Sequence, residues 1–179
     1  MITRDYVSTM ASYNQWINTK LYATAGELPQ VDLVSERRAF FGSIIGTLNH
    51  IVVGDTVWLK RFATHSSGFR SLDPVRALDS PVALNQILFS DLQDLSARRT
   101  MLDSCILAWS DEITEADLQQ IIAYTNMRGI AARKTLAALL LQFFNHQTHH
   151  RGQATTLLSQ AGKDVGVTDV LALLPDVEA

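Results

Sequence analysis

The chain has 179 residues, of which 47% are hydrophobic and 18% charged, and its formal net charge at pH 7 is −3. This length and apolar content exclude a disordered chain and predict a single folded domain over residues 1–179. One cysteine excludes a disulfide scaffold, and a pI near 5.9 argues against a nucleic-acid partner, which favours a basic surface.

The first part of the chain contains two segments with the apolar periodicity of a helix. Apolar side chains recur at steps of three and four, which predicts a first helix over residues 3–28 that Pro29 ends. The same spacing predicts a second helix over residues 39–62. Residues 63–80 are rich in turn and capping residue types, so we expect a long connection there.

The next part predicts a third helix followed by a hairpin. Ser80 followed by Pro81 is typical of a helix start, so the third helix is expected to run from Ser80 to Trp109. Residues 114–133 have a different pattern, which indicates a short β-hairpin that turns at residues 126–129.

The last part predicts a fourth helix over residues 133–160, with Gly162 as its C-terminal cap. The tail, residues 165–179, is apolar enough to pack back onto the body. Four long helices predict an all-α four-helix bundle. The long connection after the second helix lets it run parallel to the third. We therefore expect up-down-down-up topology, with the hairpin between the third and fourth helices.

The composition also bears on the oligomeric state and the cellular location of the protein. Its charged fraction lies below the ~25% usual for globular domains, and its mean hydropathy is +0.07, which favours some surface buried in an oligomer. The longest apolar stretch, residues 136–144, is interrupted by Gln142 and is too short to cross a bilayer. The N-terminal segment has no apolar run typical of a signal peptide. We therefore expect a cytoplasmic protein with no membrane association.

Histidines cluster in the predicted fourth helix. His146 and His150 are four residues apart, so they lie one above the other on a helix. The stripe that contains them begins at Leu139 and ends at Leu157, which indicates that it faces the core. This spacing lets both imidazoles reach one metal ion.

A third ligand is expected from the second helix, where His50 has Gly46 and Gly54 one turn away on either side. Glycine within a helix costs about 1 kcal/mol relative to alanine, which indicates that close approach or open volume is needed there. His50, His146 and His150 are therefore predicted to hold a divalent ion such as zinc or nickel, with the remaining positions open to water or substrate.

The alternative is that these are core histidines, hydrogen-bonded to Asn145, Thr148 or backbone carbonyls. The other candidates have ordinary roles. We expect a surface or interface position for His149, surface or interhelical ion pairs for Arg151, a solvated loop for His65, an inert core position for Cys105, and a place outside the ligand set for Asp55.

Four short motifs occur together along the chain. They are residues 13–18 (YNQWIN), 48–51 (LNHI, followed by Asp55, Trp58 and Leu59), 146–153 (HQTHHRGQ) and 166–169 (GVTD). In this combination the chain resembles the DinB family of bacterial four-helix-bundle proteins over nearly its whole length. The resemblance implies an up-down-down-up bundle, often a homodimer, with a divalent metal on three histidines that correspond to His50, His146 and His150.

Two functional hypotheses follow. The first is a metal-dependent enzyme, either a hydrolase or a transferase that uses a low-molecular-weight thiol. Relatives in the wider superfamily resemble transferases and isomerases that use bacillithiol or mycothiol. The second is a non-catalytic, stress- or damage-associated dimeric bundle in which the metal is structural or absent.

Overall fold

The long helices begin where a side chain satisfies the free N–H groups of the first turn. The computed structural model describes residues 2–176, and its four long helices are α1 (Arg4–Ala25), α3 (Ile44–Phe62), α5 (Leu92–Glu112) and α7 (Leu136–Gln160). The side chain before each helix accepts hydrogen bonds from backbone N–H groups two or three residues later; these capping residues are Thr3, Ser43, Asp91 and Thr135. Each cap contributes about 1 kcal/mol.

Shorter elements connect the long helices. They are α2 (Gln30–Val34), the 3-10 turn η1 (Arg70–Leu72), α4 (Asp73–Arg76), α6 (Glu115–Gln119), β1 (Ile121–Thr125), β2 (Ala131–Thr135) and the 3-10 turn η2 (Val170–Leu173). The two strands pair antiparallel, with Ile121 opposite Thr135 and Thr125 opposite Ala131. Gly129 turns the chain between them with a φ of +77°. The predicted hairpin is confirmed.

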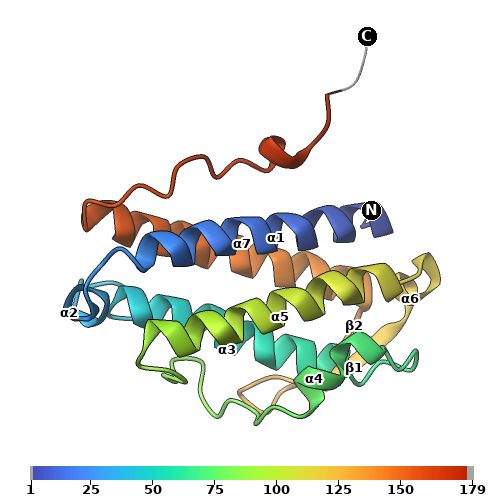
Figure 1. Cartoon of the computed structure of the whole chain (residues 1–179). Helices are drawn as coiled ribbons and strands as arrows, with labels where there is room; N and C mark the ends of the chain where they lie inside the picture. The colour runs from blue at the N-terminus through green and yellow to red at the C-terminus, as the bar shows by residue number, and fades with distance from the viewer. Residues whose placement is uncertain (1, 177–179) are drawn as a thin grey trace.

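The topology is up-down-down-up, as the long connection predicts. Helix α1 packs against α5 and α7, and α3 packs against the same two helices. Figure 1 shows that α3 and α5 run in one direction while α1 and α7 run in the other. The bundle therefore places α3 antiparallel to α7, and it brings the residues predicted to bind metal onto neighbouring helices.

The predicted start of the third helix is wrong. Helix α5 begins at Leu92, and residues 80–91 form an irregular loop instead of the first turns. The side-chain oxygen of Asn49 accepts hydrogen bonds from the N–H groups of Leu88 and Phe89, and its amide donates to the Phe89 carbonyl. These tertiary hydrogen bonds satisfy backbone groups that would otherwise bond within a helix. The loop conformation is therefore more stable here than the helix that Ser80 and Pro81 predict.

The other predicted boundaries shift for local reasons. Helix α1 ends at Ala25, so Pro29 lies beyond it and instead precedes α2. Helix α3 begins at Ile44 because the chain turns before it, where Gly42 has a φ of +74°. Helix α7 begins at Leu136 because the preceding five residues belong to β2. Gly162 follows α7 with a φ of +76°, which agrees with the predicted cap.

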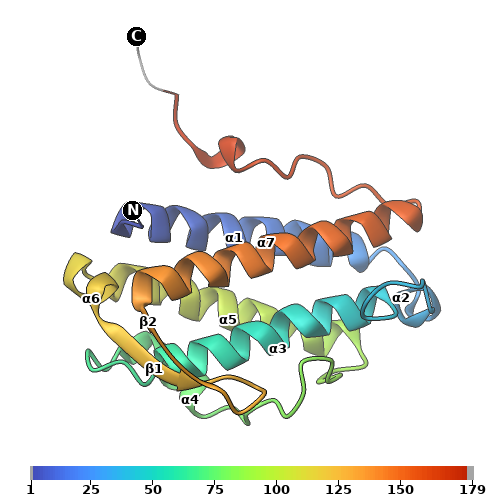
Figure 2. The ribbon, with the colours of Figure 1, turned by 180° about the vertical axis from the view of Figure 1, so that it is seen from behind.

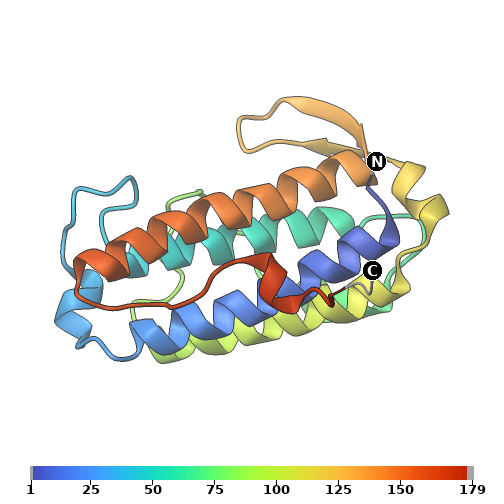
Figure 3. The ribbon, with the colours of Figure 1, turned by 90° about the horizontal axis from the view of Figure 1, so that it is seen from above.

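The C-terminal tail packs on the bundle only in part. Val165 is buried, and the Tyr13 hydroxyl donates to the Thr168 carbonyl at 2.7 Å. Leu171, by contrast, is 73% exposed. Figure 3 shows the tail running back over α1. The prediction of a packed tail therefore holds for its first half, and residues 177–179 lie outside the described part of the chain.

No helix within residues 2–176 combines the length and apolar character needed to cross a membrane.

Candidate metal centre

The imidazole of His50 on α3 meets those of His146 and His150 on α7. The Nε2 atom of His50 lies 3.2 Å from that of His146 and 3.1 Å from that of His150. Figure 2 shows α3 and α7 side by side, with the hairpin crossing one end of the pair. The three predicted residues thus form one cluster whose ligand atoms all lie within 4.8 Å of one another, which could hold a metal ion.

The spacing of these nitrogens suits a shared divalent ion. Nitrogens held about 2.1 Å from one ion lie about 3.0 Å apart at octahedral angles and about 3.4 Å apart at tetrahedral angles. The two separations measured from Nε2 of His50, 3.2 Å to His146 and 3.1 Å to His150, fall between these values. The donor set therefore fits a first-row divalent metal, and the geometry does not choose among them.

Hydrogen bonds at Nδ1 fix the protonation of two of the rings. The Nδ1–H of His50 donates to the carbonyl of Leu84 at 2.7 Å, and that of His150 donates to Oε1 of Gln153 at 2.8 Å. With the proton on Nδ1, each Nε2 presents a lone pair to the cluster centre. The two Nε2 atoms are 3.1 Å apart, and their lone pairs repel unless a cation lies between them. Outer hydrogen bonds of this kind are typical of metal-binding histidines.

The core-histidine alternative receives little support from its proposed partners. The Thr148 hydroxyl donates to the carbonyl of Phe144, and Asn145 is exposed. The one predicted partner that does occur is a backbone carbonyl, that of Leu84, and it binds His50 on the side away from the cluster. That contact is equally compatible with a metal ligand.

Gly54 explains how close α3 and α7 come at the site. A Cβ atom at this position would lie only 2.6 Å from Cε1 of His146. The inference of close approach from the two glycines is therefore confirmed at Gly54. At Gly46 a Cβ would lie 2.1 Å from the carbonyl oxygen of Phe41, so this glycine accommodates the preceding turn.

Phe41 closes one side of the cluster. Its ring stacks on His50 with centroids 3.8 Å apart, and it meets the ring of His150 edge-on at 5.5 Å. The turn that carries Phe41 packs closely enough against α3 only because Gly46 has no side chain. Phe41 thus keeps water from one side of the histidines and limits the rotation of two rings.

The environment keeps the three imidazoles neutral, the form in which they bind metal. Burial, and to a lesser extent repulsion from the neighbouring histidines, lowers the pKa of His146 to about 3. Burial likewise lowers the pKa of His50 and that of His150. At neutral pH the cluster therefore presents nitrogen lone pairs rather than protons.

A cleft of about 320 Å³ borders His146. Its walls come from one face of α3, from the tip of the β1–β2 hairpin and from Leu84 in the loop before α5. The side chain of Trp58 and that of Met127 give it an apolar lining. A small molecule in this cleft would lie beside the histidine cluster.

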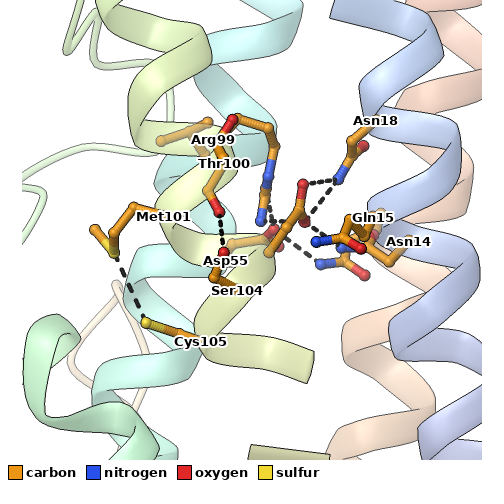
Figure 4. A network of polar contacts seen from close by, with 12 residues as sticks. Asn14, Gln15, Asn18, Asp55, Arg99, Thr100, Met101, Ser104 and Cys105 are labelled. Carbon is orange, nitrogen blue, oxygen red and sulfur yellow. Dashed lines mark hydrogen bonds and ion pairs between the residues drawn. The ribbon is translucent and has the colours of Figure 1, made fainter. Parts of the chain in front are cut away.

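A buried polar network lies behind the histidines, between all four long helices. Arg99 pairs with Asp55 at 2.5 Å and with Asp103 at 3.0 Å. The amide groups of Asn14 and Asn18 donate to Asp103. Figure 4 shows these two asparagines on α1 facing Arg99 and Asp55. The prediction that Asp55 stays outside the ligand set is confirmed, because its carboxylate accepts from Arg99 and, at 2.8 Å, from Gln147.

The expectations for two other polar residues need correction. Arg151 is only 3% exposed and contacts another helix as one expected alternative has it, but through a hydrogen bond to Asn14 on α1 rather than an ion pair. His65 is also buried, since its ring stacks on Phe69 with centroids 5.0 Å apart. The expectations for His149, which is exposed, and Cys105, which is buried, are confirmed.

Sequence reasoning missed the outer partners of the histidines. Gln153 carried a usable signal, because it lies three residues after His150 on the same face of the helix. Leu84 carried none, because it contributes a backbone carbonyl from an irregular loop. Phe41 likewise lies in a turn whose path no periodicity indicates.

Comparison with known proteins relates the whole chain to one family. Protein DinB of Bacillus subtilis (strain 168) is 25% identical to the chain over 165 residues, which cover 92% of this chain and 91% of that protein. No solved structure gives a significant match. The sequence profile of the DinB family matches residues 1–176. The chain therefore belongs to the DinB family.

Proposed function

We propose that the protein is a metal-dependent enzyme in which His50, His146 and His150 bind a divalent cation such as zinc or nickel. The observation that carries this proposal is the convergence of three Nε2 atoms from two helices, with Nδ1 of His50 and His150 fixed from outside. Three protein ligands leave coordination positions free, which is the pattern of catalytic rather than structural sites.

A bound divalent ion would lower the pKa of a coordinated water or thiol, so that hydroxide or thiolate is available near neutral pH. The residues around the site would bind the substrate and exclude water from the histidines. Phe41 keeps water from one side of the histidines, and the cleft beside His146 has room for a small molecule. No carboxylate lines this cleft within the described residues.

Two reaction classes suit such a site. Thiol transfer joins a low-molecular-weight thiol to an electrophile held in the cleft, and hydrolysis adds water to a substrate held there. The apolar walls formed by Trp58 and Met127 support an organic substrate in either case.

The first test is elemental analysis of the purified protein beside His146→Ala and the double variant His50→Ala, His150→Ala. We expect about one divalent ion per chain in the parent, as a three-ligand site requires, and none in the variants. His149→Ala is the matched control, since it removes an exposed histidine from the same helix and should retain the ion. Unchanged metal content in His146→Ala would refute the site, provided that circular dichroism shows all variants folded.

The second test separates an enzyme from a non-catalytic bundle. The metal-loaded protein is assayed for transfer of a small thiol to an aromatic electrophile and for hydrolysis of activated esters. Turnover that is lost in His146→Ala supports catalysis. A bound ion without turnover in either class would favour the non-catalytic, stress- or damage-associated alternative.

We also propose a cytoplasmic homodimer. Several large apolar side chains are unusually exposed, including Phe40 at 86% and Val82 at 83%, and a partner subunit would bury such residues. Light scattering after size exclusion should give about twice the chain mass of 19.8 kDa. A mass equal to one chain at micromolar concentration would refute the dimer.

A further inference from the structure

The cleft beside His146 is positively charged although the whole chain carries a net charge of −3. Arg61 and Arg128 line it. An adjoining pocket of about 250 Å³ shares Arg61 and adds Lys60. Neither pocket has an acidic side chain among its lining residues within the described chain. Local charge that opposes the charge of the molecule indicates a preference for anions.

Arg61 is held in place by contacts with two rings and a backbone carbonyl. Its guanidinium lies over the ring of Trp58 at 4.7 Å and over that of Tyr124 at 4.9 Å. Its Nη2 donates to the carbonyl of Thr125 at 3.1 Å, which ties the end of α3 to the hairpin. Because its position is fixed, Arg61 would lose little side-chain entropy on binding a ligand.

Arg61 also lacks a partner for its charge. No carboxylate forms an ion pair with it in the part of the chain that the structure describes. Burial lowers the pKa of its guanidinium, because the cation has lost part of its water without gaining an anion. A guanidinium presents paired N–H donors that match the two oxygens of a carboxylate.

The spacing along α3 relates Arg61 to the histidine cluster. Gly54, which contacts His146, precedes Arg61 by seven residues, or about 10 Å of helix. Trp58 lines the cleft between them, and Met127 of the hairpin tip lines it as well. The cleft therefore has a metal-binding end, an apolar middle and a cationic end.

We propose that this cleft binds a small organic carboxylate, whose anionic group lies against Arg61, whose apolar part lies along Trp58 and Met127, and whose reacting group lies beside His146. This inference rests on the proposed metal site and adds the substrate class to it. Arg61 is then a substrate-binding residue that determines specificity.

The test uses the cobalt-loaded protein and two thiols. They differ in the group at the end of the chain opposite the thiol. The probe is 8-mercaptooctanoate, whose extended chain is about as long as the 10 Å of helix between Gly54 and Arg61, and the neutral comparison is 1-octanethiol. Binding is followed by the thiolate-to-cobalt absorption band. The proteins are the parent, Arg61→Gln, Arg61→Lys and Arg133→Gln, which removes an exposed arginine of β2 that lines neither pocket.

We expect the parent to bind the carboxylate about 10- to 100-fold more tightly than the neutral thiol, the range for a charge-assisted hydrogen bond. Arg61→Gln should abolish this preference, Arg61→Lys should retain only part of it because lysine keeps the charge but not the paired N–H donors, and Arg133→Gln should leave it unchanged. Equal affinities in the parent, or a preference that survives in Arg61→Gln, would overturn the inference.

The design keeps this inference separate from the metal site. Cobalt d–d bands recorded before any thiol is added report metal binding by the histidines alone. Without those bands, the metal site fails and the inference fails with it. With those bands and equal thiol affinities, only the carboxylate inference fails.

Discussion

At the residue scale, Gly54 determines how His146 fits beside α3. The imidazole occupies the space where any other residue would place its Cβ, 2.6 Å from Cε1. His146 also lacks the outer hydrogen bond that fixes the other two rings, since its Nδ1 has no partner among the described residues. Its orientation therefore depends on packing, and Gly54 forms the surface against which it packs.

Gly54→Ala should separate metal affinity from stability. The added methyl displaces the His146 ring and should weaken metal binding about tenfold, the low end for changes around a ligand. Alanine also favours helix by about 1 kcal/mol, so the metal-free variant should be no less stable than the parent unless the ring cannot move. Metal affinity is measured by competition with a chelator, and stability by urea unfolding of the metal-free protein.

Gly152→Ala is the matched control, because a Cβ there would meet no atom within 4 Å. It should gain helix stability and keep its metal affinity. Equal metal affinities for Gly54→Ala and Gly152→Ala would show that the position of His146 does not depend on Gly54.

The three histidines of the proposed metal site were easier to predict than the residues that position them. His146 and His150 follow from a four-residue spacing on an apolar face, and Gly54 draws attention to His50. The outer partners depend on where loops pass in three dimensions. The Leu84 carbonyl reaches His50 from a segment 34 residues away, and any residue type could supply that atom.

At the element scale, the loop of residues 80–91 shows where local signals fail. The order of helices and hairpin, and their directions, follow from periodicity and from the length of one connection. The start of α5 does not, because the buried side chain of Asn49 takes hydrogen bonds from Leu88 and Phe89 and fixes the loop. Nothing near Ser80 in the sequence reveals that a distant asparagine competes with helix formation.

Asn49→Ala should affect the metal site through this loop. The substitution leaves the N–H groups of Leu88 and Phe89 without their acceptor, so stability should fall by about 1–3 kcal/mol. The hydrogen bond between the Leu84 carbonyl and His50 should then weaken, and metal affinity should fall about tenfold. Asn145→Ala, at an exposed position of α7, is the control for both measurements.

Chelator competition on the folded variant, with folding confirmed by circular dichroism, provides the measurement. A variant that loses stability but binds metal as tightly as the parent would show that the loop supports the fold without orienting His50.

At the scale of the whole molecule, charged and amide groups in the interior join the four helices. Arg99 and Asp103 are four residues apart on α5, a spacing that in sequence is equally typical of a surface ion pair. Their burial became apparent only when α1 and α3 were placed around them. Such networks are costly to desolvate, so each carboxylate depends on its partners.

Asp103→Asn tests the balance of charge in this interior. Burial raises the pKa of Asp103 to about 6, more than Arg99 lowers it, whereas an unfolded aspartate titrates near a pKa of about 3.9. Between these values the folded state binds the extra proton, so the contribution of Asp103 to stability is present below about pH 4 and lost as pH rises to about 6. The asparagine variant should therefore gain stability relative to the parent across this range.

Urea unfolding of parent and variant at several pH values from 4 to 8 gives this difference directly, because the other titrating groups are common to both. A difference that is constant with pH, or that changes in the opposite direction, would show that Arg99 keeps Asp103 ionised throughout.

The distribution of ligands along the chain has a consequence for biosynthesis. His50 belongs to the third helix in chain order, whereas both other ligands lie on α7, the last of the long helices. During translation, a nascent chain carries one ligand until α7 has been made and has docked antiparallel on α3. Loading of the proposed metal site would therefore be one of the last events in maturation, and a product truncated before residue 146 would leave the ribosome without that site.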